Sequence, residues 1–290
     1  MQKSTSPLKA NNKIPTSLTV GTVELNVKNL VIMKEFYQSV LRLKILYESK
    51  KKISFGSDNS SLVVLHDTSD LPESNPSHAG LYHFAILFSS QSDLASTILH
   101  VLKSRPELFS GSADHLVSEA FYFSDPEGNG IELYYDRDHS QWQWEEGQVK
   151  MATLYLDPVA YIEEHTVKKE SGKITMGHIH LRVGDVKKAE QFYVEILGFD
   201  ITAKLPGALF ISVGGYHHHI GLNSWESQGA QKRLDSLGLK SIEFFFPHQK
   251  DLLIIKERLR RSKIEFREQD NFLILHDPWN NELLLKAIKE

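Results

Sequence analysis

Near the middle of the chain, the spacing of several ionisable side chains indicates two short strands joined by a tight turn. His115 precedes an aromatic segment that contains Tyr122, and Asp125 and Pro126 follow it. Asp, Pro and Gly favour a chain reversal here, so a second strand is predicted around Glu132. Because side chains alternate along a strand, Glu132 points away from the face of its apolar neighbours. A carboxylate that faces a sheet-lined pocket must be ion-paired, protonated or bound to a metal.

Two histidines lie in segments that are also predicted to be strands. His83 and His178 each follow a glycine in an apolar stretch. Two histidines and one carboxylate with open coordination positions are the ligand set of non-haem iron(II) oxygenases. The sequence therefore predicts a divalent-metal site made of His83, Glu132 and His178.

The alternative is a purely structural role for each residue. A single histidine in a strand is more often a hydrogen-bonded core residue than a metal ligand, and a single Glu after a turn is usually solvated. The metal site is favoured because all three residues occupy corresponding positions of a repeat. His180 lies on the same strand face as His178, so it is a competing ligand or a hydrogen-bonding neighbour of the ligands.

The composition excludes several classes of function. The net charge is −4 with both signs scattered, so no nucleic-acid groove or basic membrane patch is expected. No apolar run reaches the ~18 residues that a membrane helix needs. The chain has no cysteine, which excludes disulfides, zinc–thiolate sites and cysteine nucleophiles. The first residues lack the apolar core of a secretion signal, so we expect a cytoplasmic protein.

A unit of strand, helix and further strands recurs roughly every 60 to 80 residues. Helical spacing of apolar residues predicts helices near residues 30–40, 92–103, 186–197 and 249–262. Units one and three share a Phe-Tyr pair in the helix, and units two and four share an Asp-Pro turn. The chain is therefore interpreted as a duplicated pair of units, with domains at residues 18–138 and 173–290 and a connector at residues 139–172.

This pattern resembles the vicinal oxygen chelate superfamily, which includes glyoxalases, bleomycin-resistance proteins and extradiol dioxygenases. The resemblance covers nearly the whole chain. It implies an α+β fold in which four βαβββ units form two barrels of the glyoxalase/extradiol-dioxygenase type. In this family the metal ligands come from the first and last strands of a unit, around a divalent metal.

The repeats show which units carry ligands at those positions. Aligned on their glycines, the four first strands offer Thr22, His83, His178 and Ser241. Glu132 follows its turn aspartate by seven residues, whereas Glu282 follows the aspartate of unit four by five, so Glu282 is expected to be out of register. The site then combines units two and three. Either these units share a barrel, or they meet across a dimer interface of a homo-oligomer.

The segment from residue 113 to residue 132 also resembles the signature of extradiol ring-cleaving dioxygenases. His115, Tyr122, Asp125-Pro126, Gly128 and Glu132 match that signature, and Ala113 departs from it. The strand motifs around the three expected ligands look like those of bacterial catechol 2,3-dioxygenases. The resemblance implies an enzyme of aromatic compound catabolism that uses Fe(II), or Mn(II), and O2 to cleave catechol or a substituted catechol beside its diol.

The same resemblance implies catalytic residues near the metal. A histidine has the right proton affinity to act as acid and base on the diol. The family places it in the strand that here contains three consecutive histidines, and the spacing to Gly221 favours His218 over His217 and His219. His115 and Tyr122 would donate hydrogen bonds to substrate oxygens, although Tyr122 could equally be a packing residue.

Two other classes of function remain open at this stage. A metal-dependent lyase or thiol transferase of the glyoxalase kind would have the same fold, but such enzymes use four protein ligands. A non-catalytic protein that sequesters an aromatic compound would need no metal. Fold alone does not choose among the three classes.

Overall fold

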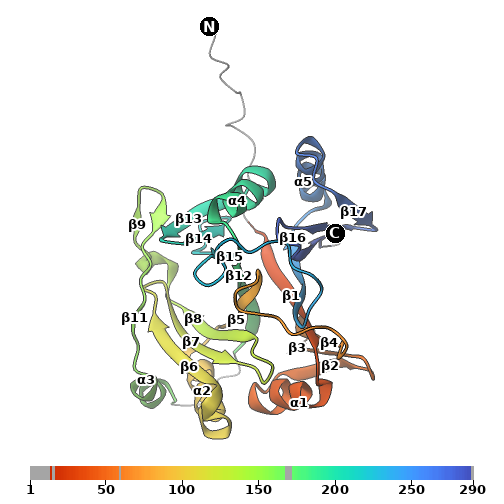
Figure 1. Ribbon diagram of the computed structural model, residues 1–290. Helices are drawn as coiled ribbons and strands as arrows, with labels where there is room; N and C mark the ends of the chain where they lie inside the picture. Colours follow the sequence, from red (N-terminus) through yellow and green to blue (C-terminus); the bar gives the residue numbers. More distant parts are fainter. Residues whose placement is uncertain (1–13, 15–16, 59, 167–171, 289–290) are drawn as a thin grey trace.

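The computed structural model describes residues 14, 17–58, 60–166 and 172–288, which form two curled sheets packed back to back (Figure 1). In these residues the first sheet has the order β17 (Phe266–Gln269), β18 (Phe272–His276), β19 (Glu282–Ala287), β16 (Gly238–Phe246), β1 (Thr19–Val27), β4 (Ser60–Asp67), β3 (Lys52–Ser57), β2 (Lys44–Glu48). The second has the order β11 (Leu154–Tyr155), β6 (Phe109–Asp114), β7 (Ser118–Ser124), β8 (Gly130–Asp136), β5 (Gly80–Phe88), β12 (Ile174–Arg182), β15 (Ile220–Asn223), β14 (Ala208–Ser212), β13 (Asp200–Leu205). The expected α+β class is confirmed.

The sheets show how the four units pair. At the centre of the second sheet, β5 of unit two runs antiparallel to β12 of unit three. At the centre of the first, β1 of unit one runs antiparallel to β16 of unit four. Units two and three therefore share one sheet within a single chain, and no dimer interface is needed to bring them together. Each sheet takes one unit from residues 18–138 and one from residues 173–290.

The helices begin and end near the predicted residues. They are α1 (Leu30–Glu35), α2 (Gln91–Ser104), α3 (Pro158–His165), α4 (Val186–Glu190) and α5 (Gln249–Arg261), with short 3-10 turns at Pro106–Leu108 and His139–Gln141. α1 and α4 continue as π-helical turns, η1 (Phe36–Val40) and η4 (Gln191–Leu197). Gly198 ends η4 in the left-handed conformation, at φ 100°, where a side chain would be strained. In the part of the chain described, no helix has both the length and the apolar character to cross a membrane.

The described residues of the segment between the halves form regular secondary structure. The segment contains the short hairpin of β9 (Trp144–Glu145) and β10 (Gln148–Val149), then β11 and the helix α3. β11 pairs with β6 at the edge of the second sheet. The predicted connector with a short helix thus also extends the sheet that carries units two and three.

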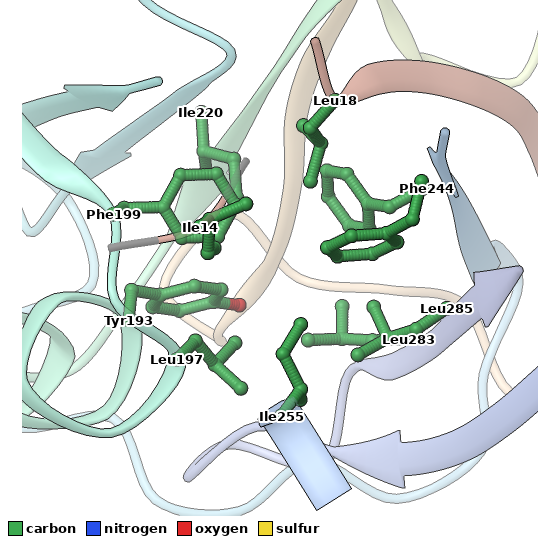
Figure 2. Close-up of a pocket in the computed structure, with 11 residues that line it drawn as sticks. Ile14, Leu18, Tyr193, Leu197, Phe199, Ile220, Phe244, Ile255, Leu283 and Leu285 are labelled. Atoms are coloured by element: carbon green, nitrogen blue, oxygen red, sulfur yellow. The ribbon is translucent and has the colours of Figure 1, made fainter. Parts of the chain in front are cut away.

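Apolar side chains fill the space between the two sheets. Along β12, Ile179 and Leu181 are fully buried in this core, so the alternating residues His178 and His180 lie on the opposite, concave face. Figure 2 shows one region of the core, where Ile220 of the second sheet faces Phe244 and Leu285 of the first, with η4 and α5 beside them. The core fixes the strands and leaves each concave face free for other side chains.

Two buried aspartates tie the turns of units two and four to helices of units one and three. Asp125 accepts hydrogen bonds from the hydroxyl of Tyr37 at 2.9 Å and from the side-chain amide of Asn129 at 2.8 Å. Asp277 makes the matching bond with the hydroxyl of Tyr193 at 3.0 Å. The Asp-Pro motif therefore has a structural role, because it holds the turn that leads into the strand of Glu132.

Candidate active site

Three strands of the second sheet bring His83, Glu132 and His178 together on its concave face. The ligand atoms of these side chains all lie within 4.8 Å of one another. Nε2 of His83 is 3.0 Å from Oε2 of Glu132, and Nε2 of His178 is 3.2 Å from the same oxygen. All three side chains are buried. The predicted cluster therefore exists, and within the described residues it is the one group of this kind.

Strand register explains why these three side chains converge. Ala85 is the sheet neighbour of both Glu132 in β8 and His178 in β12. His83 precedes Ala85 by two residues and so lies on the same face. The small side chain of Ala85, fully buried between them, leaves the space that the three ligand atoms surround.

The pairing of the donor atoms with one another is incomplete. Nε2 of His178 forms a hydrogen bond with Oε2 of Glu132, whereas Nε2 of His83, 3.0 Å from the same oxygen, is buried and lacks a hydrogen-bond partner among the described residues. An imidazole nitrogen left unpaired at contact distance from a carboxylate is poorly placed for a hydrogen bond but well placed to share a cation. Residues that could hold iron(II), manganese(II) or a similar ion are thus His83, Glu132 and His178.

Burial and charge set the protonation states of these ligands. Burial alone would raise the pKa of Glu132, but the neighbouring His178 and His83 hold that pKa well below its ordinary value. Burial lowers the pKa of His178 to about 4, although the Glu132 carboxylate opposes the shift. An ionised carboxylate and a neutral imidazole are the forms that bind a metal without first losing a proton.

The register also shows that the protein offers no fourth ligand at the equivalent position. Glu132 lies beside the residue two after His83, and Gly221 lies beside His180, the residue two after His178. Gly221 has no side chain, and a Cβ there would lie 2.8 Å from the ring of His180. Unit three thus contributes one ligand where unit two contributes two, which leaves coordination positions for other molecules.

His180 is not part of the cluster, although it lies beside it. Its ring centre is 4.9 Å from that of His83, and its Nε2 lies 2.9 Å from the side-chain amide nitrogen of Asn223. The carbonyl oxygen of that amide accepts a hydrogen bond from the backbone of Trp225, at 3.4 Å, which orients the amide. The amide therefore donates to Nε2 of His180 and occupies its lone pair.

A chain of hydrogen bonds fixes the orientation of His218. Nδ1 of His218 is 2.7 Å from Nδ1 of His217, and Nε2 of His217 is 2.9 Å from Oδ1 of Asp136. A carboxylate oxygen accepts from Nε2 of His217, and a neutral His217 then accepts a hydrogen bond at Nδ1. His218 must then carry its proton on Nδ1, which leaves Nε2 with a free lone pair. His218 also lines the cavity in front of the metal cluster, with its ring centre 4.0 Å from that of His178.

The other oxygen of Asp136 is bound by Tyr216, which is in turn bound by Tyr134. The hydroxyl of Tyr216 donates to Oδ2 at 2.8 Å, and the hydroxyl of Tyr134 lies 2.7 Å from that of Tyr216. Tyr134 fits there because residue 177 is a glycine; a Cβ at Gly177 would lie 1.8 Å from the Tyr134 hydroxyl oxygen. Asp136 and Tyr216 were not among the residues selected from the sequence. Asp136 follows Glu132 by four residues on the same strand face, a periodicity that could have identified it.

His115 and Tyr122 form a second hydrogen-bonded pair in the cavity. Nδ1 of His115 is 2.7 Å from the carbonyl oxygen of Ala152, so His115 carries its proton there. The hydroxyl of Tyr122 therefore donates to Nε2 of His115, at 2.6 Å. Burial raises the pKa of Tyr122 well above its ordinary value, and the nearby Glu132 adds to the rise. The two residues lie where they were expected, but the proton of Tyr122 is directed at His115.

A cavity of about 680 Å³ opens in front of the cluster. His83, Glu132, His115, Tyr122 and His218 line it, together with Phe210 and Leu205 on the apolar side and Tyr82, Arg182 and Trp225 elsewhere. A pocket of this kind, with apolar walls and a few convergent polar groups, suits a small organic ligand.

The corresponding positions of the first sheet carry no such site. Ser241 occupies the position of His83 and is the sheet neighbour of Glu282. Glu132 instead neighbours Ala85, two residues past His83, so Glu282 is out of register with Glu132, as predicted. Glu282 lies 3.7 Å from both His276 and Arg267.

Comparisons with known proteins agree with the fold. The sequence model of the Glyoxalase/Bleomycin resistance protein/Dioxygenase superfamily matches residues 19–133 and 175–271. A curated protein of Bacillus subtilis (strain 168) named catechol-2,3-dioxygenase is 35% identical over 270 residues, which cover 89% of this chain and 93% of that protein.

Solved structures show the same fold at low sequence identity. A putative dioxygenase from Bacillus subtilis has a TM-score of 0.63 and 12% identity, covering 95% of this chain and 86% of its own. Glyoxalase I from Zea mays has a TM-score of 0.55 and 13% identity, covering 93% of this chain and 92% of its own. Proteins with different names thus share this fold, and the site residues have to distinguish among their activities.

Proposed function

Because the chain belongs to the glyoxalase/bleomycin resistance protein/dioxygenase superfamily, we propose that it is an extradiol ring-cleaving dioxygenase of the catechol 2,3-dioxygenase type. Its substrates would be a small aromatic diol and O2, and its metal iron(II), or manganese(II), which accepts the same ligands. The observation that carries the proposal is a three-ligand cluster that faces a cavity also lined by His218. The relative named catechol-2,3-dioxygenase supports it.

The chain's own residues would hold the metal and leave room for substrate. His83, Glu132 and His178 bind it, and Gly221 contributes no fourth ligand. When bound, the metal supplies a redox-active centre at which a diol and O2 can meet. The competing function, a metal-dependent lyase or thiol transferase of the same fold, expects a fourth protein ligand, so the glycine weighs against it.

His218 is proposed as the acid and base. Its free Nε2 accepts a proton from a hydroxyl of the diol and can return it later to an oxygen of the opening ring. Asp136 makes this possible through His217, because it fixes which nitrogen of each ring carries a proton. When His218 gains a proton, the negative charge of Asp136 stabilises the cation that forms. The arrangement follows the same logic as an aspartate that orients a catalytic histidine.

His115 and Tyr122 are proposed to contact substrate oxygens on the opposite side of the cavity. Tyr122 has its hydroxyl proton engaged with His115, so it offers an oxygen that can also accept a hydrogen bond. The pair would orient the diol while excluding water from the reacting atoms.

The test is reconstitution with iron(II) without air, followed by addition of catechol and oxygen. We expect a yellow ring-opened semialdehyde, measured by absorbance, and its loss in His83→Ala, Glu132→Ala and His178→Ala. His276→Ala, at an exposed site on the other sheet, is the control and should retain activity. Iron bound at one equivalent with no cleavage of any catechol would contradict the proposal.

A further inference from the structure

The strand that supplies the ligand His178 also carries a cation into the cavity. His178, His180 and Arg182 alternate along β12 on its concave face, because the residues between them enter the core. At about 3.3 Å per residue, the Cα atom of Arg182 lies about 13 Å along the strand from that of His178. His180 and Arg182 both line the cavity. A ligand held at the metal cluster can therefore extend along this row of side chains toward Arg182.

The charge of Arg182 is poorly compensated by the protein. Its Nε is buried and has no hydrogen-bond partner in the described residues. No ion pair joins its guanidinium to a described residue, although the exposed Glu226 acts on it from farther away. Burial lowers the pKa of Arg182. Burial also lowers the pKa of Arg233, and the charge of Arg182 adds to that fall although Asp277 and Asp235 oppose it. A partly buried guanidinium with an unpaired donor and a second cation nearby favours the arrival of an anion.

An aromatic wall connects the metal cluster with Arg182. The ring centre of Tyr82 lies 5.0 Å from that of His180 and 5.8 Å from that of Trp225. Tyr82 reaches this face because the pairing of β5 with β12 shifts register between His180 and the next residue. Such a wall suits the flat ring of an aromatic ligand, with its polar substituent directed beyond the rings.

The size of the cavity indicates more than an unsubstituted diol. A volume of about 680 Å³ lies in the range of pockets that hold drug-sized ligands, about 300–1,000 Å³. A bare catechol would fill a small part of it and would leave the Arg182 donors facing water.

We propose that Arg182 binds an acidic substituent of the diol, so that the preferred substrates are catechols that carry a carboxylate on a short side chain. The inference rests on the proposed function and names the substrate class of the same site. A guanidinium binds a carboxylate through two parallel hydrogen bonds, which would fix the ring in one orientation at the metal. Arg182 is then a specificity-determining residue remote from the reacting atoms.

The experiment compares 3,4-dihydroxyphenylacetate with 4-ethylcatechol, which is similar in size and neutral. Binding is measured without oxygen by calorimetry on the metal-loaded enzyme, and turnover is measured separately as kcat/KM. We expect the acid to be favoured by about 30-fold or more in the parent enzyme. Arg182→Gln should abolish that preference and leave the metal content and the values for 4-ethylcatechol nearly unchanged. Arg182→Lys, which keeps a charge without the planar fork, should keep part of the preference.

A reciprocal variant provides the matched control. Glu226→Gln removes the exposed carboxylate that acts on Arg182, so it should raise the preference for the acid. If the parent enzyme binds the two catechols equally, or if Arg182→Gln loses affinity for both to the same extent, the inference is overturned. Ring cleavage in the same experiment would still support the proposed function. Selective binding of the acid that disappears in Arg182→Gln, with no cleavage of either compound, would support the anion site and contradict the dioxygenase.

Discussion

At the scale of single residues, the identity of one glycine sets the number of protein ligands. Gly221 occupies the position in unit three that Glu132 occupies in unit two, and the ring of His180 covers it. A carboxylate there would complete a four-ligand site and reduce the space for a bidentate diol and O2. The difference between the proposed oxygenase and a lyase of the same fold therefore depends on the lack of a side chain at Gly221.

The ligand Glu132 gives the first prediction. Glu132→Ala should lower iron(II) or manganese(II) affinity by at least about 100-fold, since it removes the carboxylate that contacts both histidines. A metal that binds only the folded state stabilises it by about 2.7 kcal/mol at 100 times its Kd. Thermal unfolding with and without metal should show a rise in Tm for the parent protein and none for the variant. An undiminished rise in the variant would mean that the metal binds elsewhere.

The residue Asp136 gives the second prediction. Asp136→Asn should lower kcat for catechol by about 10- to 100-fold, because it loosens control over which nitrogens of His217 and His218 carry protons. Bound metal per chain should stay the same, since no ligand changes. Asp114→Asn, which removes a partly exposed carboxylate paired with Arg137, is the matched control and should retain kcat. Loss of metal together with activity would indicate a structural role for Asp136.

At the scale of elements, a turn of one unit is fastened to a helix of another. The carboxylate of Asp125 receives the Tyr37 hydroxyl and two backbone amides in addition to the Asn129 side chain. Burial raises the pKa of Asp125 to about 6, although these donors oppose the shift. The turn precedes the strand of Glu132, so the same contacts help position a ligand.

The raised pKa of Asp125 gives the third prediction. Because its folded-state pKa lies above the unfolded value of 3.8, its protonation favours the folded state. That stability is fully present below about pH 4 and is lost as pH rises through about 6. The parent protein should therefore lose up to about 3 kcal/mol relative to Asp125→Asn between those pH values. Urea unfolding of both metal-free proteins at pH 4, 5 and 6.5 measures it; a constant difference would contradict the assignment.

At the scale of the whole molecule, the site is assembled from both halves of the chain. His83 and Glu132 come from the first half and His178 and His218 from the second, and the pairing of β5 with β12 joins them. The other sheet is joined in the same way by β1 and β16. The first half alone would contain β1 and β5 without their partner strands, and the second half alone would contain β12 and β16 without theirs.

This arrangement gives the fourth prediction. Fragments of residues 1–138 and 139–290, produced separately, should each bind manganese(II) at least about 100-fold more weakly than the whole chain, because neither holds the full triad. Mixing the fragments should restore binding and far-UV circular dichroism typical of the whole chain. Full affinity in either fragment would show that a complete site can form without the other half.

Local patterns were sufficient to predict the elements and the residue types of the site. Helix spacing and caps act over a few residues, so the helices were predicted to within one or two residues wherever apolar periodicity was strong. The α1 and α4 helices were correct in extent, but their change to π-helical turns at Phe36 and Gln191 was not predicted. The candidate ligand triad was predicted from alternation within strands, from the repeat, and from the ligand positions that the family resemblance implies.

The repeated units and the three candidate ligands followed from the sequence, because each depends on short-range periodicity or on a motif. The three consecutive histidines were expected in a strand, which was wrong, since His217, His218 and His219 lie in the loop that precedes β15 (Ile220–Asn223). Only the tertiary structure decided that units two and three share a sheet, that Asp136 orients His218, and that Arg182 enters the cavity. Asp136 and His217 are 81 residues apart, and the pairing of strands that joins them depends on packing across the whole core. Strand alternation could place Asp136 on the face of Glu132, but its pairing with His217 has no signature in the local order of side chains and becomes visible only when the chain is folded.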